Sequence, residues 1–154
     1  MEDDAHPHPY SGLTPDVVLN ALESAGLQCD GSQLALNSYE NRVYQIGIVD
    51  APPVVAKFYR PERWSDAAIL EEHAFALELQ EREIPVVAPL ALAGAKTLHA
   101  AEGFRFAVFP RCGGRAPELD KPDTLQWMGR FLGRIHAVGA VTPFRERATL
   151  DIAS

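Results

Sequence analysis

The stretch Val54–Pro61, VVAKFYRP, decides the fold that the sequence predicts. Its apolar, β-branched and aromatic residues are typical of a short buried strand, and Pro61 ends it. Lys57 stands in the middle with apolar residues on both sides. A covered lysine costs free energy unless a carboxylate or an anionic ligand meets it. The alternative is that Lys57 protects a sheet edge and keeps its ammonium group in solvent.

A helix is expected directly after this strand, over residues 65–82. Ser65 and Asp66 form a typical helix start, and the apolar residues that follow recur at helical spacing. Glu71 and Glu72 lie inside this helix, and the residues three and four positions from each are uncharged. Neither carboxylate therefore has a lysine partner on its own helix, and Lys57 is the expected partner across space.

The other elements follow from hydrophobic periodicity and from turn residues. A polar turn over residues 37–42 separates the first two strands, and the glycines after Cys112 break regular structure. Together the elements predict an α+β fold, an antiparallel sheet of about five strands with a helix packed on it. Besides the Lys57 strand, the predicted elements are a helix from Thr14 to Gly26, strands over residues 34–36, 43–49, 87–93 and 104–109, and a last helix from residues 120–122 to Gly139.

Composition excludes several classes of protein. The 154 residues suffice for one domain or slightly more, and a hydrophobic fraction of 47% can supply a core. The net charge of −7 argues against a general nucleic-acid surface. Two distant cysteines, no signal-peptide pattern and no long apolar run favour a cytoplasmic protein away from membranes. His6 and His8 lack matching ligands, so we expect no metal site and a flexible tail over residues 1–12.

Five blocks of sequence resemble the bacterial stress-response kinases of the aminoglycoside phosphotransferase and choline kinase-like family. That family is similar to eukaryotic protein kinases in fold. The resemblance implies a kinase-like small lobe over residues 13–111. It also implies a hinge linker and the start of a truncated large lobe over residues 112–154. The matching blocks are residues 36–45, 55–64, 69–73, 106–110 and 129–136.

The resemblance also implies roles for individual residues. Ser38 would lie in the loop that faces the ATP phosphates, and Lys57 would hold the α- and β-phosphates. Glu72 would orient Lys57, with Glu71 left open as the alternative. Phe109 to Cys112 would form the hinge, whose backbone groups contact the adenine.

The family uses ATP and magnesium to phosphorylate serine and threonine on proteins. Its His-Gly-Asp catalytic loop and its later metal-binding aspartate have no counterpart here, and Asp120 and Asp151 match neither. We therefore expect weak nucleotide binding without catalysis, because phosphoryl transfer needs both the base and the metal. The alternatives are part of a kinase for homoserine, choline or an aminoglycoside, and a non-catalytic interaction module if the gene ends at Ser154.

Overall fold

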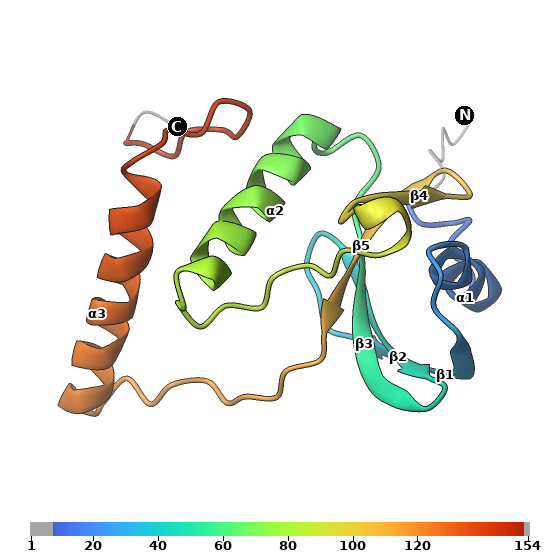
Figure 1. The fold of residues 1–154 in the computed structure, drawn as a ribbon, viewed down its shortest axis with the longest axis horizontal. Helices are drawn as coiled ribbons and strands as arrows, with labels where there is room; N and C mark the ends of the chain where they lie inside the picture. Colours follow the sequence, from blue (N-terminus) through green and yellow to red (C-terminus); the bar gives the residue numbers. More distant parts are fainter. Residues whose placement is uncertain (1–7, 153–154) are drawn as a thin grey trace, which may run out of the picture. The chain divides into compact units, whose positions relative to one another are not determined.

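A computed structural model describes residues 8–152, which divide into two compact units (Figure 1). The first unit combines the chain up to Ser65 with Leu90–Arg111. The second combines Asp66–Pro89 with the chain from Cys112 onwards. The resemblance predicts a small lobe over residues 13–111 and the start of a large lobe over residues 112–154, and these boundaries stay a prediction. The first seven residues of the expected tail lie outside the described residues.

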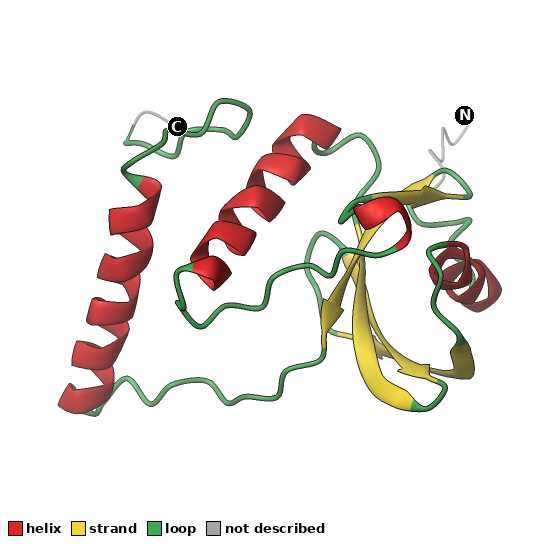
Figure 2. Ribbon diagram, viewed as in Figure 1, coloured by secondary structure: helices red, strands yellow, loops and turns green. Residues whose placement is uncertain are grey.

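The first unit contains a five-stranded antiparallel sheet, which confirms the expected α+β fold (Figure 2). The strand order is β1-β2-β3-β5-β4, so β3 lies in the middle between β2 and β5. Two hairpins connect β1 to β2 and β2 to β3, as the turn residues predict. The strands are β1 (Cys29–Leu36), β2 (Arg42–Ile48), β3 (Ala51–Phe58), β4 (His99–Ala101) and β5 (Phe104–Pro110).

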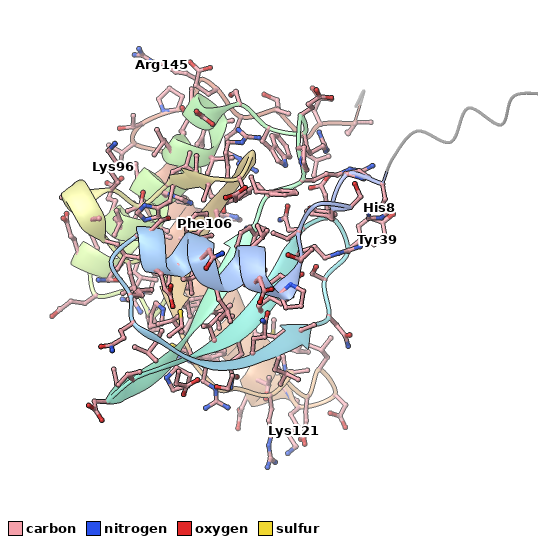
Figure 3. The ribbon with its side chains drawn as sticks, turned by 90° about the vertical axis from the view of Figure 1, so that its right-hand side faces the viewer. His8, Tyr39, Lys96, Phe106, Lys121 and Arg145 are labelled. Atoms are coloured by element: carbon pink, nitrogen blue, oxygen red, sulfur yellow. The ribbon has the colours of Figure 1, made fainter. Side chains whose placement is uncertain are left out.

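Helix α1 (Pro15–Ser24) packs on one face of this sheet (Figure 3). Thr14 caps it by accepting a hydrogen bond from the Val17 N–H at 3.3 Å, as the sequence predicts. Tyr10, in the stretch assigned to the tail, is buried in the same core, and its ring stacks on Phe104. The centre of the core consists of Val18, Leu22, Ile46, Phe58 and Phe106, all fully buried.

The strand expected over residues 87–93 is wrong, because this segment has no regular structure. Leu90 N–H donates to the Val108 carbonyl at 2.7 Å, so the segment meets β5 at one point. Within this segment Pro89 lacks the N–H group that a continuous ladder needs. A short 3-10 turn, η1 (Ala93–Ala95), follows. The strand that completes the sheet is instead β4, joined to β5 by a tight turn at Glu102 and Gly103, both with positive φ.

The second unit is built on helices α2 (Asp66–Glu81) and α3 (Pro122–Gly139). Both lie where the sequence predicts them, and Gly139 ends α3 as expected. Leu79, Ile84 and Val138 form a small apolar cluster between the two helices. Within residues 8–152, no helix combines the length and the apolar character that a membrane crossing requires.

Candidate functional site

Lys57 lies on the sheet face opposite to α1. Because side chains alternate along a strand, the buried Val54, Ala56 and Phe58 turn Lys57 and Val55 to the other side. Lys57 is half-buried, and its cross-strand neighbours are Val43 on β2 and Ala107 on β5. Its Nζ lies 5.0 Å from the centroid of the Tyr59 ring, within the range of a cation–π contact.

The surroundings of Lys57 on this face are apolar. Register places Leu36 and Leu34 of β1 in the same two cross-strand rows as Lys57 and Val55. Directly opposed residues of an antiparallel sheet point to the same side, so these rows form one surface. We call it the Lys57 face. It combines one cation with an apolar platform, and such a surface suits a ligand with a flat apolar part and an anionic part. Its members are Leu34, Leu36, Val43, Gln45, Val55, Lys57, Ala107 and Phe109.

Ser38 lies in the turn between β1 and β2, at the end of the sheet where the Lys57 row lies. Its side chain is exposed, and its hydroxyl donates to the carbonyl of Asn41. Asn41 in turn accepts the Arg60 N–H through its side-chain oxygen at 3.2 Å. These contacts tie the turn to the end of β3.

Glu40 fixes the same turn more firmly. Its Oε1 accepts from Arg63 Nε at 2.6 Å, its Oε2 accepts from Trp64 Nε1 at 3.4 Å, and its backbone carbonyl accepts from the Tyr10 hydroxyl at 2.7 Å. The hydrogen bond from Arg63 is the main reason why the pKa of Glu40 is lowered. The turn that carries Ser38 is therefore restrained by contacts of Glu40 with Arg63, Trp64 and Tyr10.

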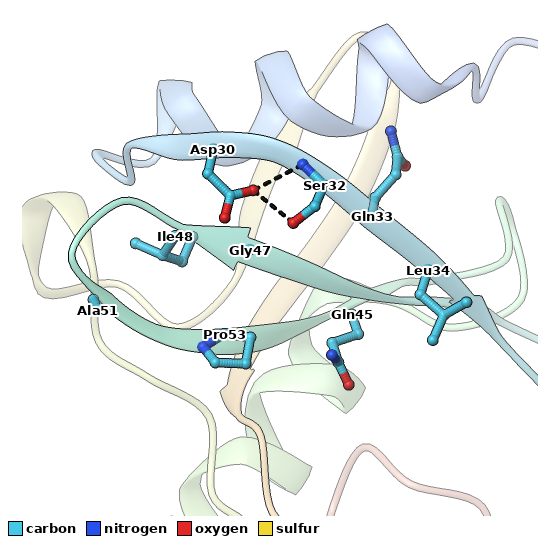
Figure 4. Close-up of a pocket in the computed structure, with 9 residues that line it drawn as sticks. All are labelled: Asp30, Ser32, Gln33, Leu34, Gln45, Gly47, Ile48, Ala51 and Pro53. Atoms are coloured by element: carbon cyan, nitrogen blue, oxygen red, sulfur yellow. Dashed lines mark hydrogen bonds between the residues drawn. The ribbon is translucent and has the colours of Figure 1, made fainter.

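A hollow of about 340 Å³ extends the Lys57 face toward the β2–β3 turn (Figure 4). Leu34 and Gln45, which belong to that face, line one side of it. Asp30 accepts from the Ser32 N–H at 2.8 Å and from the Ser32 hydroxyl at 2.6 Å. These bonds lower the pKa of Asp30. Gly47 leaves room for these two polar side chains, because a Cβ there would collide with both unless they moved.

Phe109 and Cys112, the expected ends of the hinge, fall in different units. Phe109 on β5 pairs with Val55 and is half-buried on the Lys57 face. Cys112 is an exposed free cysteine at the point where the chain enters the second unit. Its hinge role stays a prediction.

Glu71 and Glu72 lie on α2 in the second unit, and both contact the segment after α3. Glu72 Oε2 accepts from Arg147 Nη1 at 2.9 Å. Glu71 accepts from the backbone N–H groups of Arg145, Glu146 and Arg147 at 2.9 to 3.3 Å. The bond from the Arg145 amide is the largest cause of the lowered pKa of Glu71. The expected pairing of Lys57 with one of these carboxylates stays a prediction.

Within residues 8–152 no group of three or more His, Cys, Asp or Glu side chains could hold a metal ion. The described part of the chain thus offers one cation on an apolar face, a fixed serine turn and two anchored carboxylates. Comparison with known proteins adds the family. Residues 32–153 match the model of the phosphotransferase enzyme family, APH.

The chain belongs to this phosphotransferase family. It is 46% identical over 153 residues to the serine/threonine protein kinase RdoA of Salmonella typhimurium, covering 99% of this chain and 46% of the relative. It is 48% identical over 143 residues to stress response kinase A of Escherichia coli K12, covering 93% of this chain and 43% of the relative. These matches confirm the resemblance found in the sequence. The chain spans about half the length of the curated relatives it matches.

A solved structure shares the phosphotransferase fold. Amicoumacin kinase hAmiN, in complex with AMP-PNP, Ca²⁺ and Ami, superposes with a TM-score of 0.70 at 23% identity. The superposition covers 84% of this chain and 42% of that one. At this identity the likeness supports the fold.

Sequence patterns did not reveal three features of this phosphotransferase chain. The first feature is the Lys57 face. The alternation of side chains along a strand could have predicted it, because every second residue of the Lys57 strand points to that face. The polar cluster of Glu40 and Arg63 joins two blocks that carry the resemblance, although neither residue had an expected role. Arg147 had no signal, because it lies in a stretch without periodicity and meets Glu72 from far along the chain.

Proposed function

We propose that this chain is the ATP-binding part of a cytoplasmic, ATP-dependent serine/threonine protein kinase of the stress-response type. The observation that carries the proposal is the Lys57 face, where Lys57 is the one charged residue among eight side chains of two cross-strand rows. An ammonium group on such a platform suits a nucleotide, which joins a flat apolar base to charged phosphates. The names of the curated relatives support the reaction class.

In this proposal the adenine lies on the apolar part of the Lys57 face, against Val43 and Val55. The backbone from Phe109 to Cys112 supplies the polar contacts to its edge. Lys57 holds the α- and β-phosphates, and Ser38 with the neighbouring turn amides faces the outer phosphates. The contacts of Glu40 support this role, because a preorganised turn loses little conformational entropy when it binds an anion.

Glu72 is the proposed partner of Lys57 rather than Glu71. Both oxygens of Glu71 accept hydrogen bonds from the backbone of the segment after α3. Glu72 accepts a hydrogen bond from the Arg147 side chain through Oε2 at 2.9 Å, and the family resemblance assigns the lysine partner to this position. A carboxylate accepts at both oxygens, so Glu72 can hold an arginine and a lysine together.

Magnesium is proposed as the cofactor of the whole kinase, where it would neutralise charge on the phosphates. Its ligands and the general base are expected beyond the residues of this chain. In this proposal the 154 residues bind ATP, and other residues of the whole kinase supply the groups that carry out phosphoryl transfer.

A nucleotide titration tests the proposal. We expect Lys57→Ala to weaken binding of an ATP analogue by roughly 10- to 100-fold, the loss that follows from removing a charge-assisted contact. Lys96→Ala is the matched control, because Lys96 is an exposed lysine of the same unit away from the Lys57 face. Isothermal calorimetry on the three proteins measures the effect. Equal affinities for all three would contradict the proposal.

A small-molecule kinase is the second candidate, favoured by the fold shared with amicoumacin kinase hAmiN. The two candidates use the same ATP site and differ in the acceptor. Phosphate transfer by the whole protein, assayed with radiolabelled ATP, separates them. Labelling of a small alcohol without labelling of any protein would replace the first candidate by the second.

A further inference from the structure

The segment that follows α3 contacts α2 through three kinds of interaction. Phe144 packs edge-on against Phe75, with ring centroids 5.1 Å apart. The backbone N–H groups of residues 145–147 surround the Glu71 carboxylate. The Arg147 guanidinium donates to Glu72 Oε2 at 2.9 Å and to the Ala68 carbonyl at 3.4 Å. We call residues 144–147 the clasp.

The clasp contacts α2 on two different sides of the helix. Successive residues of an α-helix point about 100° apart, so Glu71 and Glu72 project to different sides. A segment that contacts both of them restrains rotation of α2 about its axis more than a segment that contacts one of them. Contacts with both, together with Phe75 one turn further on, fix the rotational setting of the helix and the direction of each carboxylate.

Arginine suits this position better than lysine. A guanidinium is planar and carries five N–H donors, so it can bind a carboxylate and a carbonyl at the same time. Arg147 does this across one turn of α2, between Ala68 and Glu72. Its side chain is 28% exposed and that of Glu72 is 39% exposed, so the pair is partly shielded from water.

We propose that Arg147 is a positioning residue for Glu72, and that the clasp fixes the direction of the Glu72 carboxylate on α2, on which the proposed pairing with Lys57 depends. This inference rests on the proposed function, because it assigns the clasp to the Lys57 partner. Arg147 acts through Glu72 and has no contact with the nucleotide in this scheme. Nucleotide affinity is thereby coupled to the docking of a segment that lies outside the nucleotide site.

A double-mutant cycle in the full chain tests the coupling. We expect Arg147→Met to weaken binding of an ATP analogue by roughly two- to fivefold, as for a partly exposed ion pair. In the Lys57→Ala background the same change should have no effect, since Glu72 then has no lysine to position. Arg145→Met is the matched control, because the Arg145 side chain is exposed and only its backbone contacts Glu71. Arg147→Lys should restore part of the lost affinity.

Hydrogen exchange supplies a measurement that does not depend on nucleotide. We expect Glu71→Gln to speed exchange of the amides of residues 145–147 by roughly tenfold, because each loses a charge-assisted acceptor. Glu78→Gln is the control on the same helix, since Glu78 pairs with Arg82 and not with the clasp. Circular dichroism confirms that each variant is folded.

The outcomes separate the two proposals. If Lys57→Ala weakens binding but Arg147→Met has no more effect than Arg145→Met, the positioning role is wrong and the nucleotide site stands. Fully additive effects of Lys57→Ala and Arg147→Met would also overturn the positioning role. If Lys57→Ala has no effect, the proposed function fails and the positioning role falls with it. Unchanged exchange in Glu71→Gln would show that the clasp does not form in solution.

Discussion

In the first unit the side chains of α1 and of the strands meet in one continuous apolar core, whereas in the second unit a small apolar cluster is supplemented by polar contacts of the clasp. Phe58 and Phe106 are fully buried in the first core, with ring centroids 5.2 Å apart. On α3, by contrast, Leu125, Trp127 and Leu132 are 48 to 60% exposed. The comparison teaches that burial orders the sheet, whereas in the second unit two carboxylates of α2 bind the segment after α3 and add polar contacts to a small apolar cluster.

The largest effect is expected in the sheet core. Phe106→Ala should lower the free energy of unfolding by about 3–5 kcal/mol, because it removes a fully buried ring and leaves a cavity. Urea denaturation followed by circular dichroism measures the change. A loss below about 1 kcal/mol would show that the first unit does not depend on its core in the way that the comparison states.

A smaller effect is expected in the second unit. Val138→Ala should cost about 1–2 kcal/mol, because it removes two methylene equivalents from the cluster with Leu79 and Ile84. The control is Leu132→Ala on the same helix, where an exposed side chain should change stability by less than about 0.5 kcal/mol. The same denaturation assay applies. If the two variants lose equal stability, the exposed face of α3 is also packed, and the cluster with Leu79 and Ile84 is not its main apolar contact.

The smallest expected effect is a local one, caused by pH. Hydrogen bonds from the clasp amides, Arg145 first, and the charge of Arg147 lower the pKa of Glu71 below its ordinary value of 4.5, although partial burial acts in the opposite direction. A lowered pKa in the folded state means that the clasp is favoured above the unfolded-state pKa and is lost as the pH falls through the folded-state pKa.

NMR shifts of the amides of residues 145–147 should therefore titrate with a midpoint below 4.5. The titration should disappear in Glu71→Gln, while the core of the first unit keeps its signals. A midpoint at or above 4.5 would contradict the bonding of Glu71 to the clasp.

Sequence alone predicts those parts of the fold whose causes are local. The Thr14 cap and the ends of α3 depend on residues a few positions apart, and the structure has them as expected. The Lys57 strand is present but runs from Ala51 to Phe58, so it begins and ends three residues earlier than predicted. The run from Val87 to Ala93 has the composition of a strand, yet Pro89 in its middle lacks the N–H group that a ladder needs. The Glu102-Gly103 pair is the local feature that marks β4, because a two-residue loop with positive φ joins the strands of a hairpin.

The residues of the candidate site also divide into those that local sequence predicts and those that it does not. Lys57 is visible in sequence because a cation interrupts an apolar strand. Glu71 and Glu72 are visible because apolar residues surround them on their helix. The clasp is not visible, because hydrogen bonds to backbone N–H groups require no particular side chain at residues 145 and 146. Only the Arg147 side chain could have marked it, and a single arginine carries no pattern.

The two outer strands of the sheet have a consequence for how the protein behaves in concentrated solution. The register of β1 is interrupted between Cys29 and Gln33, and β4 is only three residues long. Neither border offers a long, straight row of unpaired amides and carbonyls to a second molecule. The sheet is thereby protected from growing by strand addition into fibrous aggregates, even though Leu34 on its border is largely open to water.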